Sequence, residues 1–292
     1  MIVYFPRVTI FVGRLAAAAV LGAVLTGCGG SDPRPGPTAA RSASASPPAA
    51  TAPGSPQSKP PTMAPGPAGL TPVFERARTS AGEKTVALTF DADMTADQGP
   101  RAARGEHFDN PALIASLRRL KVPSTVFMTG RWAEEYPDQA RSIGTDPLFE
   151  IANHSYSHHA FKSPCYGLPA LDNKAARADV ERAFAAFRKA GARNTVPYFR
   201  FPGGCYDDRA LRALAPAGVT AVQWDVVSGD AFASDADAVA EQVLAGVRPG
   251  SVVVMHCTRS AAPVTDEAIE RIVPELRRRG YRFVKVSELI EK

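Results

Sequence analysis

Short, apolar, β-prone runs alternate with amphipathic helical patterns from Thr71 to the C-terminus, and this alternation limits the possible folds more than any other feature. Several runs are continuously apolar, which is typical of strands buried on both faces of a sheet. The expected strands are Thr85–Asp91, Ser124–Thr129, Phe149–Asn153, Tyr198–Pro202, Thr220–Val226, Ser251–His256 and Tyr281–Val286. Repeated β-α alternation favours parallel strands joined by helical crossovers. We therefore expect an α/β domain that is closed, or nearly closed, into a barrel.

The expected helices lie between these strands. One begins at Asn110-Pro111, because asparagine is a good N-cap and proline is favoured at the first helical position. The other expected helices are Asp172–Ala190, Asp207–Leu214, Asp235–Gly246 and Thr265–Arg279. The polar stretch Met94–Asn110 is long for a loop between a strand and a helix, which more often indicates a functional loop.

Residues 1–27 have the features of an export signal. Arg7 and Arg14 precede an apolar run, LAAAAVLGAVL, that is too short to span a bilayer comfortably by itself. The run ends in LTGC, which resembles a bacterial lipobox, in which the cysteine thiol receives a diacylglyceryl group. We therefore expect an exported protein, anchored by a lipid on Cys28 to the outer face of the bacterial cell membrane. An ordinary signal peptide, or an uncleaved anchor running from Ile2, is the alternative.

Residues 28–70 read as a linker. From Gly29 onward this segment is almost entirely Pro, Ala, Ser, Gly and Thr, and it has no aromatic residue. Such a segment cannot bury enough apolar surface to offset chain entropy, so we expect it to stay extended and disordered. At about 3 Å per residue it would hold the following domain on the order of 100 Å from the anchor. A tolerated low-complexity tract without function is the alternative.

The charge excludes one class of partner. The formal charge is +5, and the first 27 residues contribute two arginines and no acid, which leaves +3 without them. This excess is too small, and too evenly mixed along the chain, to indicate nucleic-acid binding. The hydrophobic fraction of 45% is sufficient for a sizeable core.

The histidines indicate a metal site. The chain has five of them, His107, His154, His158, His159 and His256. His154 and His158 in NHSYSHH are four apart, so on a helical turn their imidazoles would lie on one face. Two imidazoles and one carboxylate are a common ligand set for Zn²⁺ or a similar divalent ion. We expect one such ion, Zn²⁺ with Co²⁺ or Ni²⁺ as alternatives.

The other residues that could do chemistry follow the ends of the predicted strands. Asp91 and Asp93 in ALTFDADMT are two apart, so on an extended strand both carboxylates point to one face. Arg200 lies in YFRFPGG, Asp225 and Asp230 lie in WDVVSGD, and His256 ends SVVVMH. In a β/α barrel, active sites form at this edge of the sheet.

Two histidines have weaker cases. On a helix the side chain of His159 would point roughly 100° away from that of His158, so we expect it at the surface or behind the ligands. For His107, in the long loop, we expect a solvated residue, with a substrate contact as the alternative.

Five segments in order resemble the motifs of the NodB-homology polysaccharide deacetylases, carbohydrate esterase family four (CE4). They are TFDAD, HSYSH, RFPGG, WDVVSGD and VMH, and the resemblance covers roughly Lys84 to the C-terminus. It implies a distorted (β/α) barrel of the NodB-homology type, with residues 71–292 as a single catalytic domain. It also implies metal-dependent removal of acetyl groups from a polysaccharide.

The resemblance implies a role for each matching residue. Asp91 would be the general base, oriented by Arg200, and Asp93 would bind the metal together with His154 and His158. The bound ion would lower the pKa of water and polarise the acetyl carbonyl. A structural ion pair is the alternative role for Arg200.

The same resemblance makes His256 the general acid, tuned by Asp230. Asp225 is a weaker candidate for the tuning role, and Asp230 could instead cap the helix expected near Asp235. A backbone N–H after Pro202 would help to hold the oxyanion, since two glycines follow it and permit close approach.

The sequence departs from the family pattern at three places. The usual Asp-Asp is Asp-Ala-Asp here, so the division of roles between Asp91 and Asp93 is inferred. Ala231 replaces the usual aromatic residue and Val254 the usual leucine, both of which shape the acetyl pocket. These changes leave the acyl group and the sugar open, with Trp224 and Tyr206 as candidate replacement walls.

Three cysteines follow Cys28. In an exported protein two of Cys165, Cys205 and Cys257 should pair. We expect Cys165–Cys205, which would brace the rim of the site, with Cys205–Cys257 as the alternative. A role for Cys257 as a soft metal ligand is a further, weaker alternative.

These observations together predict a monomeric enzyme that releases acetate from an N-acetylglucosamine-containing cell-envelope polysaccharide, with peptidoglycan favoured because of the tether. A chitooligosaccharide deacetylase and an O-acetyl-xylan esterase would use the same residues. From a different class, a catalytically silent glycan-binding lipoprotein is the alternative. We expect the presence of Asp91, Arg200 and His256 to distinguish the enzyme from the silent protein.

Overall fold

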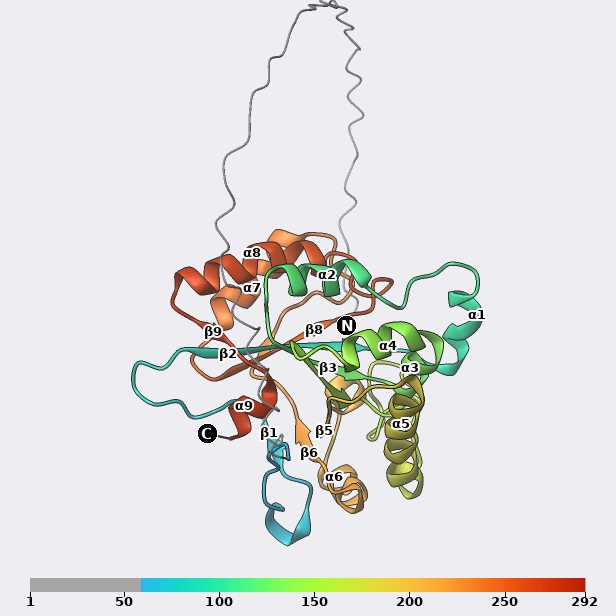
Figure 1. Ribbon diagram of the computed structural model, residues 1–292. Coiled ribbons are helices and arrows are strands. Elements are labelled where there is room, and N and C mark those ends of the chain that lie inside the picture. Colours follow the sequence, from blue (N-terminus) through green and yellow to red (C-terminus); the bar gives the residue numbers. More distant parts are fainter. Residues whose placement is uncertain (1–58, 292) are drawn as a thin grey trace, which may run out of the picture. The chain divides into compact units, whose positions relative to one another are not determined.

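The computed structural model describes residues 59–291, which form one α/β domain (Figure 1). The predicted export signal, the lipid attachment at Cys28 and most of the predicted linker lie outside the described residues. Residues 59–70, the end of that predicted linker, contact the domain. The Tyr198 hydroxyl donates a hydrogen bond to the Pro61 carbonyl (2.8 Å), and the Met63 N–H donates one to the Thr220 hydroxyl (3.1 Å).

The strands form a single parallel sheet in the order β1-β6-β5-β4-β3-β2-β8-β7, with β9 paired to β2. The strands are β1 (Val73–Phe74), β2 (Thr85–Ala92), β3 (Ser124–Met128), β4 (Phe149–Asn153), β5 (Thr195–Phe199), β6 (Thr220–Val222), β7 (Val226–Val227), β8 (Ser251–His256) and β9 (Arg282–Phe283). Arg76, just after β1, forms an isolated antiparallel bridge to Ser251 on β8. This bridge links the strand at one end of the sheet to β8, the neighbour of the strand at the other end, and the predicted barrel-type α/β fold is confirmed.

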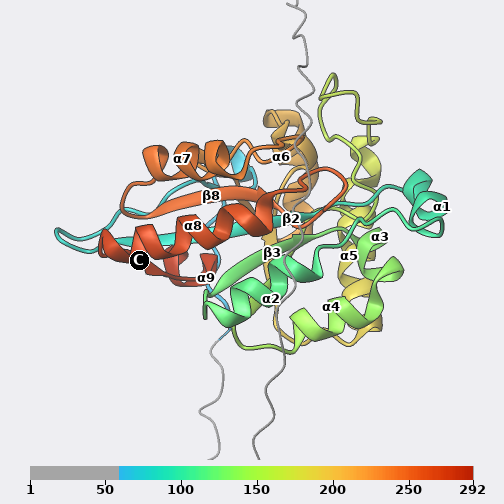
Figure 2. The same ribbon diagram turned by 90° about the horizontal axis from the view of Figure 1, so that it is seen from above.

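Helices cover the outer face of the sheet, with α2, α7 and α8 beside β2, β3 and β8 (Figures 1 and 2). The helices are α1 (Gly99–Ala102), α2 (Pro111–Arg119), α3 (Gly130–Glu135), α4 (Pro137–Gly144), α5 (Ala176–Ala190), α6 (Asp208–Leu214), α7 (Ala236–Gly246), α8 (Thr265–Arg278) and α9 (Val286–Ile290). The predicted N-cap Asn110 accepts a hydrogen bond from a backbone N–H of the first turn, and Asp207 and Asp235, predicted as the first residues of their helices, are N-caps that do the same. These side chains satisfy donors that have no partner within the helix.

Several predicted boundaries were wrong. β5 ends at Phe199, so Arg200 and Pro202 follow the strand, and the helix predicted from Asp172 begins as a 3₁₀ turn before α5. Only Arg282–Phe283 of the predicted last strand forms a strand, and α9 begins at Val286. Helices α3 and α4 were not predicted, since both are short and follow directly on a strand or on each other.

The predicted strand Thr220–Val226 is divided in two. β6 pairs with β5 and β1, whereas β7 pairs with β8. Between them the Asp225 carboxylate accepts hydrogen bonds from the Val252 N–H and the Ser251 hydroxyl, both 2.9 Å long. A side chain thus replaces the regular strand pairing where the chain crosses from one end of the sheet to the other.

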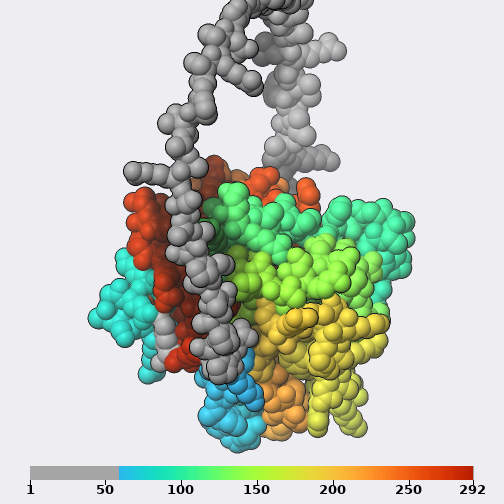
Figure 3. Space-filling view, viewed as in Figure 1, coloured from blue at the N-terminus to red at the C-terminus, as the bar shows by residue number. Residues whose placement is uncertain are grey.

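The two faces of β2 point into different cores. Val86, Leu88 and Phe90 pack against the helices, whereas Ala87 belongs to the cluster inside the barrel with Phe127. Because side chains alternate along a strand, Asp91 points to the same inner face as Ala87. The turn before β2 and the loop after it lie at opposite ends of the domain (Figure 3). The aspartates therefore sit at one mouth of the barrel.

Within residues 59–291, no helix has the length and apolar character needed to cross a membrane.

We predict that Gly144→Ala destabilises the domain by about 2 kcal/mol, because it overpacks the core. A Cβ at Gly144 would lie 2.7 Å from the Ala192 Cα and 3.1 Å from a side-chain carbon of Ile151. The free energy of unfolding from urea titration measures this. Gly99→Ala is the matched control, since the only neighbour of its Cβ would be a Glu135 oxygen at 3.8 Å. Because Gly99 is helical, its replacement should leave stability unchanged or raise it. Equal effects of the two changes would contradict the packing assigned to Gly144.

Candidate metal centre and active site

Polar side chains from β2, β4 and β8 meet at the mouth of the barrel. Asp91 on β2 lies in register with His256 on β8 and with Phe127 on β3. His154 directly follows β4. Because parallel strands end at one edge of the sheet, residues far apart in the chain come together here. The residues predicted to form the site thus lie together at the carboxyl ends of the strands.

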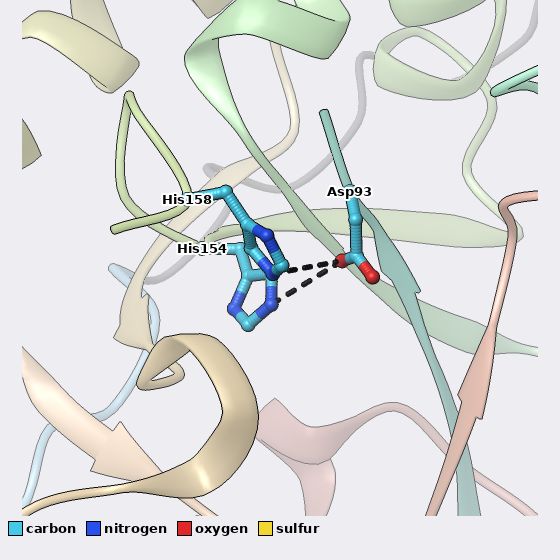
Figure 4. Close-up of side chains that lie close together, drawn as sticks. All are labelled: Asp93, His154 and His158. Carbon is cyan, nitrogen blue, oxygen red and sulfur yellow. Dashed lines mark ion pairs between the residues drawn. The ribbon is translucent and has the colours of Figure 1, made fainter. Parts of the chain in front are cut away.

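Asp93, His154 and His158 form a group that can hold a metal ion. Asp93 Oδ1 lies 3.3 Å from His154 Nε2 and 3.6 Å from His158 Nε2, and both imidazoles point toward it (Figure 4). One ligand atom from each residue lies within 4.8 Å of the others.

Within residues 59–291, the carboxylate of Asp93 has a buried oxygen atom without a hydrogen-bond donor. Its buried Oδ1 atom has no hydrogen-bond partner among the described residues, because neither imidazole contact has hydrogen-bond geometry. A buried carboxylate oxygen without a donor is costly. Two nitrogen atoms and one oxygen atom that converge on one point fit a divalent ion such as Zn²⁺.

His154 is held in the tautomer that a ligand needs. Its Nδ1 lies 2.9 Å from the Arg200 carbonyl oxygen. Since a carbonyl only accepts, Nδ1 carries the proton and Nε2 faces Asp93. A backbone carbonyl that fixes the far nitrogen in this way orients metal-binding histidines generally.

The prediction of a helical turn between His154 and His158 was wrong. The segment is an irregular loop, with Ser155 and His158 in the left-handed region (φ 68° and 56°). The Ser155 N–H donates to Asn153 Oδ1 (2.8 Å), and the His158 N–H donates to Ser155 Oγ (2.8 Å). Buried side chains thus satisfy backbone groups that a helix would have paired internally. The two imidazoles converge through this loop.

The ionisation of the group favours metal binding. Burial lowers the pKa of His158 to about 4, so this imidazole is neutral near pH 7 and its nitrogen lone pair is available. Burial alone would raise the pKa of Asp93, but the two neighbouring imidazoles hold it well below its usual range. Burial would also lower the pKa of His154, but the carboxylates of Asp91 and Asp93 raise it. The two carboxylates thus face a position where a bound cation would supply the positive charge that they require.

Asp91 is fixed by a buried ion pair. Arg200 Nη1 donates to Asp91 Oδ1 at 2.7 Å, and the arginine side chain is fully buried. Its guanidinium also donates to the Val222 carbonyl (3.2 Å) and lies 3.8 Å from the centre of the Phe127 ring. The second carboxylate oxygen, Oδ2, lies 3.8 Å from His154 Nε2 and faces the candidate metal group. The structure therefore brings Arg200 to Asp91 as the family pattern implied.

His256 and Asp230 form a second pair. His256 Nδ1 donates to Asp230 Oδ1 at 2.8 Å, and the backbone N–H of His256 and the Thr265 hydroxyl donate to Oδ2. Burial alone would lower the pKa of His256, but the hydrogen bond to Asp230 and its charge raise it to about 10. His256 is therefore protonated at neutral pH and can donate a proton from Nε2.

The alternatives for this carboxylate do not hold. The Asp225 carboxylate accepts hydrogen bonds from Ser251, Val252 and Arg248, not from His256. The cap of α7 is Asp235, so Asp230 has no capping role.

The remaining histidines lie outside the metal group. The side chain of His107 is 63% exposed and pairs with Asp109 (3.0 Å), while His159 is half-buried beside the ligands. A contact that sequence reasoning missed is Thr258, whose hydroxyl accepts from the Asp93 N–H (3.0 Å). A loop threonine carries no sequence signal for such a role.

The turn after Arg200 depends on two glycines. Gly203 has φ 64°, and a Cβ there would lie 2.6 Å from Cys165 Sγ. At Gly204 a Cβ would lie 2.5 Å from the Trp224 ring. The N–H of Gly204 is used within the turn, since it donates to the Phe201 carbonyl (2.8 Å), so the exposed Gly203 supplies the free N–H next to Pro202.

The predicted disulfide Cys165–Cys205 is present, with Cα atoms 6.0 Å apart. It joins the loop after His158 to the turn after Arg200. Cys257 is a buried free thiol, so the alternative pairing is wrong. Cys257 is also absent from the metal group found among the described residues.

Known proteins resemble this chain over most of the described domain. The sequence model of a family described as polysaccharide deacetylase matches residues 78–222. A chitooligosaccharide deacetylase from Sinorhizobium fredii is 32% identical over 218 residues, which cover 70% of this chain and 91% of that protein. A peptidoglycan-N-acetylglucosamine deacetylase from Bacillus cereus is 28% identical over 210 residues, which cover 71% of this chain and 89% of that protein.

A solved structure shows the same fold. It is a mutant, with restored enzymatic activity, of a CE4 family pseudoenzyme from Bacillus anthracis. It is 25% identical, with a TM-score of 0.60, and the match covers 75% of this chain and 71% of that chain.

We predict that Asp93→Asn weakens Zn²⁺ binding by more than roughly 10–100-fold, the usual cost of losing a residue that only orients a ligand, because it removes the charged ligand oxygen itself. Asp91→Asn is the matched control and should bind Zn²⁺ within a few-fold of the unchanged protein, since Arg200 already occupies its Oδ1 atom. Titration calorimetry of the apoprotein measures both. The opposite order of affinities would exchange the roles of the two aspartates.

Proposed function

We propose that this chain, which belongs to the polysaccharide deacetylase family, removes acetyl groups from N-acetylglucosamine units of a cell-envelope glycan, peptidoglycan above all. One observation carries the proposal. A carboxylate base, a protonated imidazole and a metal-binding group converge at one mouth of the barrel.

The group Asp93, His154 and His158 would hold the metal ion, and the orphaned Oδ1 atom of Asp93 supports this assignment. A divalent ion in such a site supplies Lewis acidity toward the acetyl carbonyl and lowers the pKa of water.

Asp91 acts as the general base in this proposal. Arg200 fixes one carboxylate oxygen and leaves Oδ2 directed toward the metal group. Oδ2 takes a proton from the attacking water, whose oxygen bonds to the acetyl carbonyl carbon. The N–H of Gly203 donates to the carbonyl oxygen as negative charge develops on it.

His256 completes the reaction as the general acid. The bond between the carbonyl carbon and the sugar nitrogen breaks, and that nitrogen takes the proton from His256 Nε2. Asp230 stabilises the protonated imidazole beforehand through the 2.8 Å hydrogen bond to Nδ1. The products are acetate and a free amino sugar.

Two features of this chain support an active cell-envelope enzyme: its complete set of catalytic side chains and its N-terminal sequence. The first is needed because the family includes a pseudoenzyme, so the fold alone does not establish turnover. Here, however, Asp91, Arg200 and His256 are all present, and each has the partner that its role requires. The lipobox-like LTGC and the Pro/Ala/Ser-rich linker support an exported protein, lipid-anchored through Cys28 to the outer face of the cell membrane.

We predict that the purified protein releases acetate from peptidoglycan, that a chelator abolishes this release, and that Zn²⁺, Co²⁺ or Ni²⁺ restores it. Chitooligosaccharides and acetylated xylan tested in parallel separate the alternative substrates. Acetate release that persists in the chelator-treated, metal-free protein would contradict the assigned mechanism. A protein that binds these glycans but releases no acetate after metal addition would be the silent binding protein.

We predict that Asp230→Asn moves the alkaline limb of the kcat/KM profile from near pH 10 to below about pH 7, since burial alone lowers the pKa of His256. The general acid must be protonated, so activity is lost as pH rises through its pKa, and activity at pH 9 should fall at least about tenfold. Asp235→Asn is the control, because it keeps the α7 cap and the parent carboxylate does not contact His256. An alkaline limb that stays in place in Asp230→Asn would show that His256 is not the acid.

A further inference from the structure

Two aromatic side chains project from the domain near the site. Tyr166 is 89% exposed and Phe232 is 87% exposed, whereas the other large hydrophobic side chains exposed within residues 59–291, Met63 and Val227, reach 38% and 53%. Aromatic rings are normally buried because water contact is unfavourable for them. An aromatic ring exposed beside a site can bury its face against a ligand.

Both residues also have a left-handed backbone. The φ angle is 46° at Tyr166 and 61° at Phe232. Bulky side chains rarely adopt this region, and such strain is concentrated at ligand-binding positions. Neither exposure nor backbone strain stabilises the domain, so folding does not explain why an aromatic residue stands at either position.

Tyr166 lies beside the turn that carries the proposed oxyanion donor. It follows Cys165, which the disulfide joins to Cys205. A Cβ on Gly203 would lie 3.3 Å from a carbon of the Tyr166 ring. The ring is therefore in direct contact with the turn at the carboxyl end of β5.

Phe232 lies on the side of the general acid. Its N–H donates to the Ala261 carbonyl in the turn after β8 (2.6 Å). Two residues earlier, Asp230 holds His256. Phe232 is thus attached to the loops at the carboxyl ends of β7 and β8.

The sheet order separates the two rings. Tyr166 is at the end of β5, and Phe232 is at the ends of β7 and β8. Between them in the sheet lie β4, which leads to His154, and β2, which carries Asp91. Along the sheet, the strands that lead to the reacting groups therefore lie between the strands at whose ends the two rings stand.

We propose that Tyr166 and Phe232 bind the sugar rings on either side of the reacting N-acetylglucosamine unit, so that the site takes an internal unit of a linear glycan. This inference rests on the proposed function and adds a preference for chains over short oligosaccharides. The C–H-rich face of a β-linked pyranose is apolar and flat, and it packs against an aromatic face by dispersion. The exposed rings would be covered only when glycan is bound.

The variants Tyr166→Gly and Phe232→Gly test this. Glycine adopts a positive φ without strain, so the thermal midpoint should not fall. For N-acetylglucosamine hexasaccharide, KM should rise about tenfold while kcat changes less than twofold, and the rise should be smaller for a disaccharide. Tyr166→Phe and Phe232→Tyr keep an aromatic face and should restore the low KM. Val227→Ala, which shortens an exposed aliphatic side chain on β7, should leave all values unchanged.

A binding measurement separates this inference from the proposed function. Co-sedimentation of chelator-treated protein with insoluble peptidoglycan reports glycan binding without turnover, and the glycine variants should be retained about tenfold less. If the unchanged protein releases no acetate but loses glycan binding in these variants, the proposed function fails and the assigned surface stands. A hexasaccharide KM and glycan retention equal to those of the unchanged protein would overturn the inference. So would a large drop in thermal midpoint, which would make the rings structural.

Discussion

The ion pair between Asp91 and Arg200 is the interaction on which the site depends. The fully buried guanidinium donates to Asp91 at 2.7 Å, and the carbonyl of the same arginine accepts from His154 at 2.9 Å. One residue thus orients both the proposed base and a proposed metal ligand. Its remaining donors reach Val222 and Gln223 at the end of β6, so the pair also joins β2 to the far side of the barrel. Removing one partner of such a buried pair would leave an uncompensated charge, which costs about 3–5 kcal/mol.

The barrel mouth concentrates negative charge that the protein alone does not fully neutralise. Arg200 compensates Asp91, but Asp93 has only two imidazoles beside it, and burial keeps one of these, His158, neutral near pH 7. The Oδ1 atom of Asp93, which has no hydrogen-bond partner among the described residues, indicates that the arrangement of these side chains suits a cation rather than a hydrogen-bond donor. The Cys165–Cys205 bridge and the glycines of the turn after Arg200 hold the surrounding loops in place. A metal ion bound by Asp93, His154 and His158 would therefore complete the charge balance that the described residues leave open.

The sequence predicts those parts of the structure that depend on local rules. Strand-helix alternation predicted the barrel, and the period-two rule placed Asp91 and Asp93 on one face. The His154–His158 segment failed because buried partners, Asn153 and Ser155, satisfy its backbone in place of helical hydrogen bonds. The division of Thr220–Val226 failed for a similar reason, since Asp225 replaces a strand contact. Such tertiary contacts carry no periodic signal, and neither does the exposure of Tyr166 and Phe232.

At the mouth, two aspartates are each paired with a basic side chain, but the group proposed to exchange a proton differs between the two pairs. In Asp91–Arg200 the cation is permanent and buried, so the carboxylate is the group left to exchange a proton. In His256–Asp230 the carboxylate is buried among three further donors, so the imidazole is the group that exchanges one. Ala92 separates the first pair from the metal group. It packs into the outer core against the helices, which directs Asp91 and Asp93 together to the inner face. An adjacent pair of aspartates on a regular strand would send one of them into that apolar layer, so here the alanine spacer lets both carboxylates serve one site.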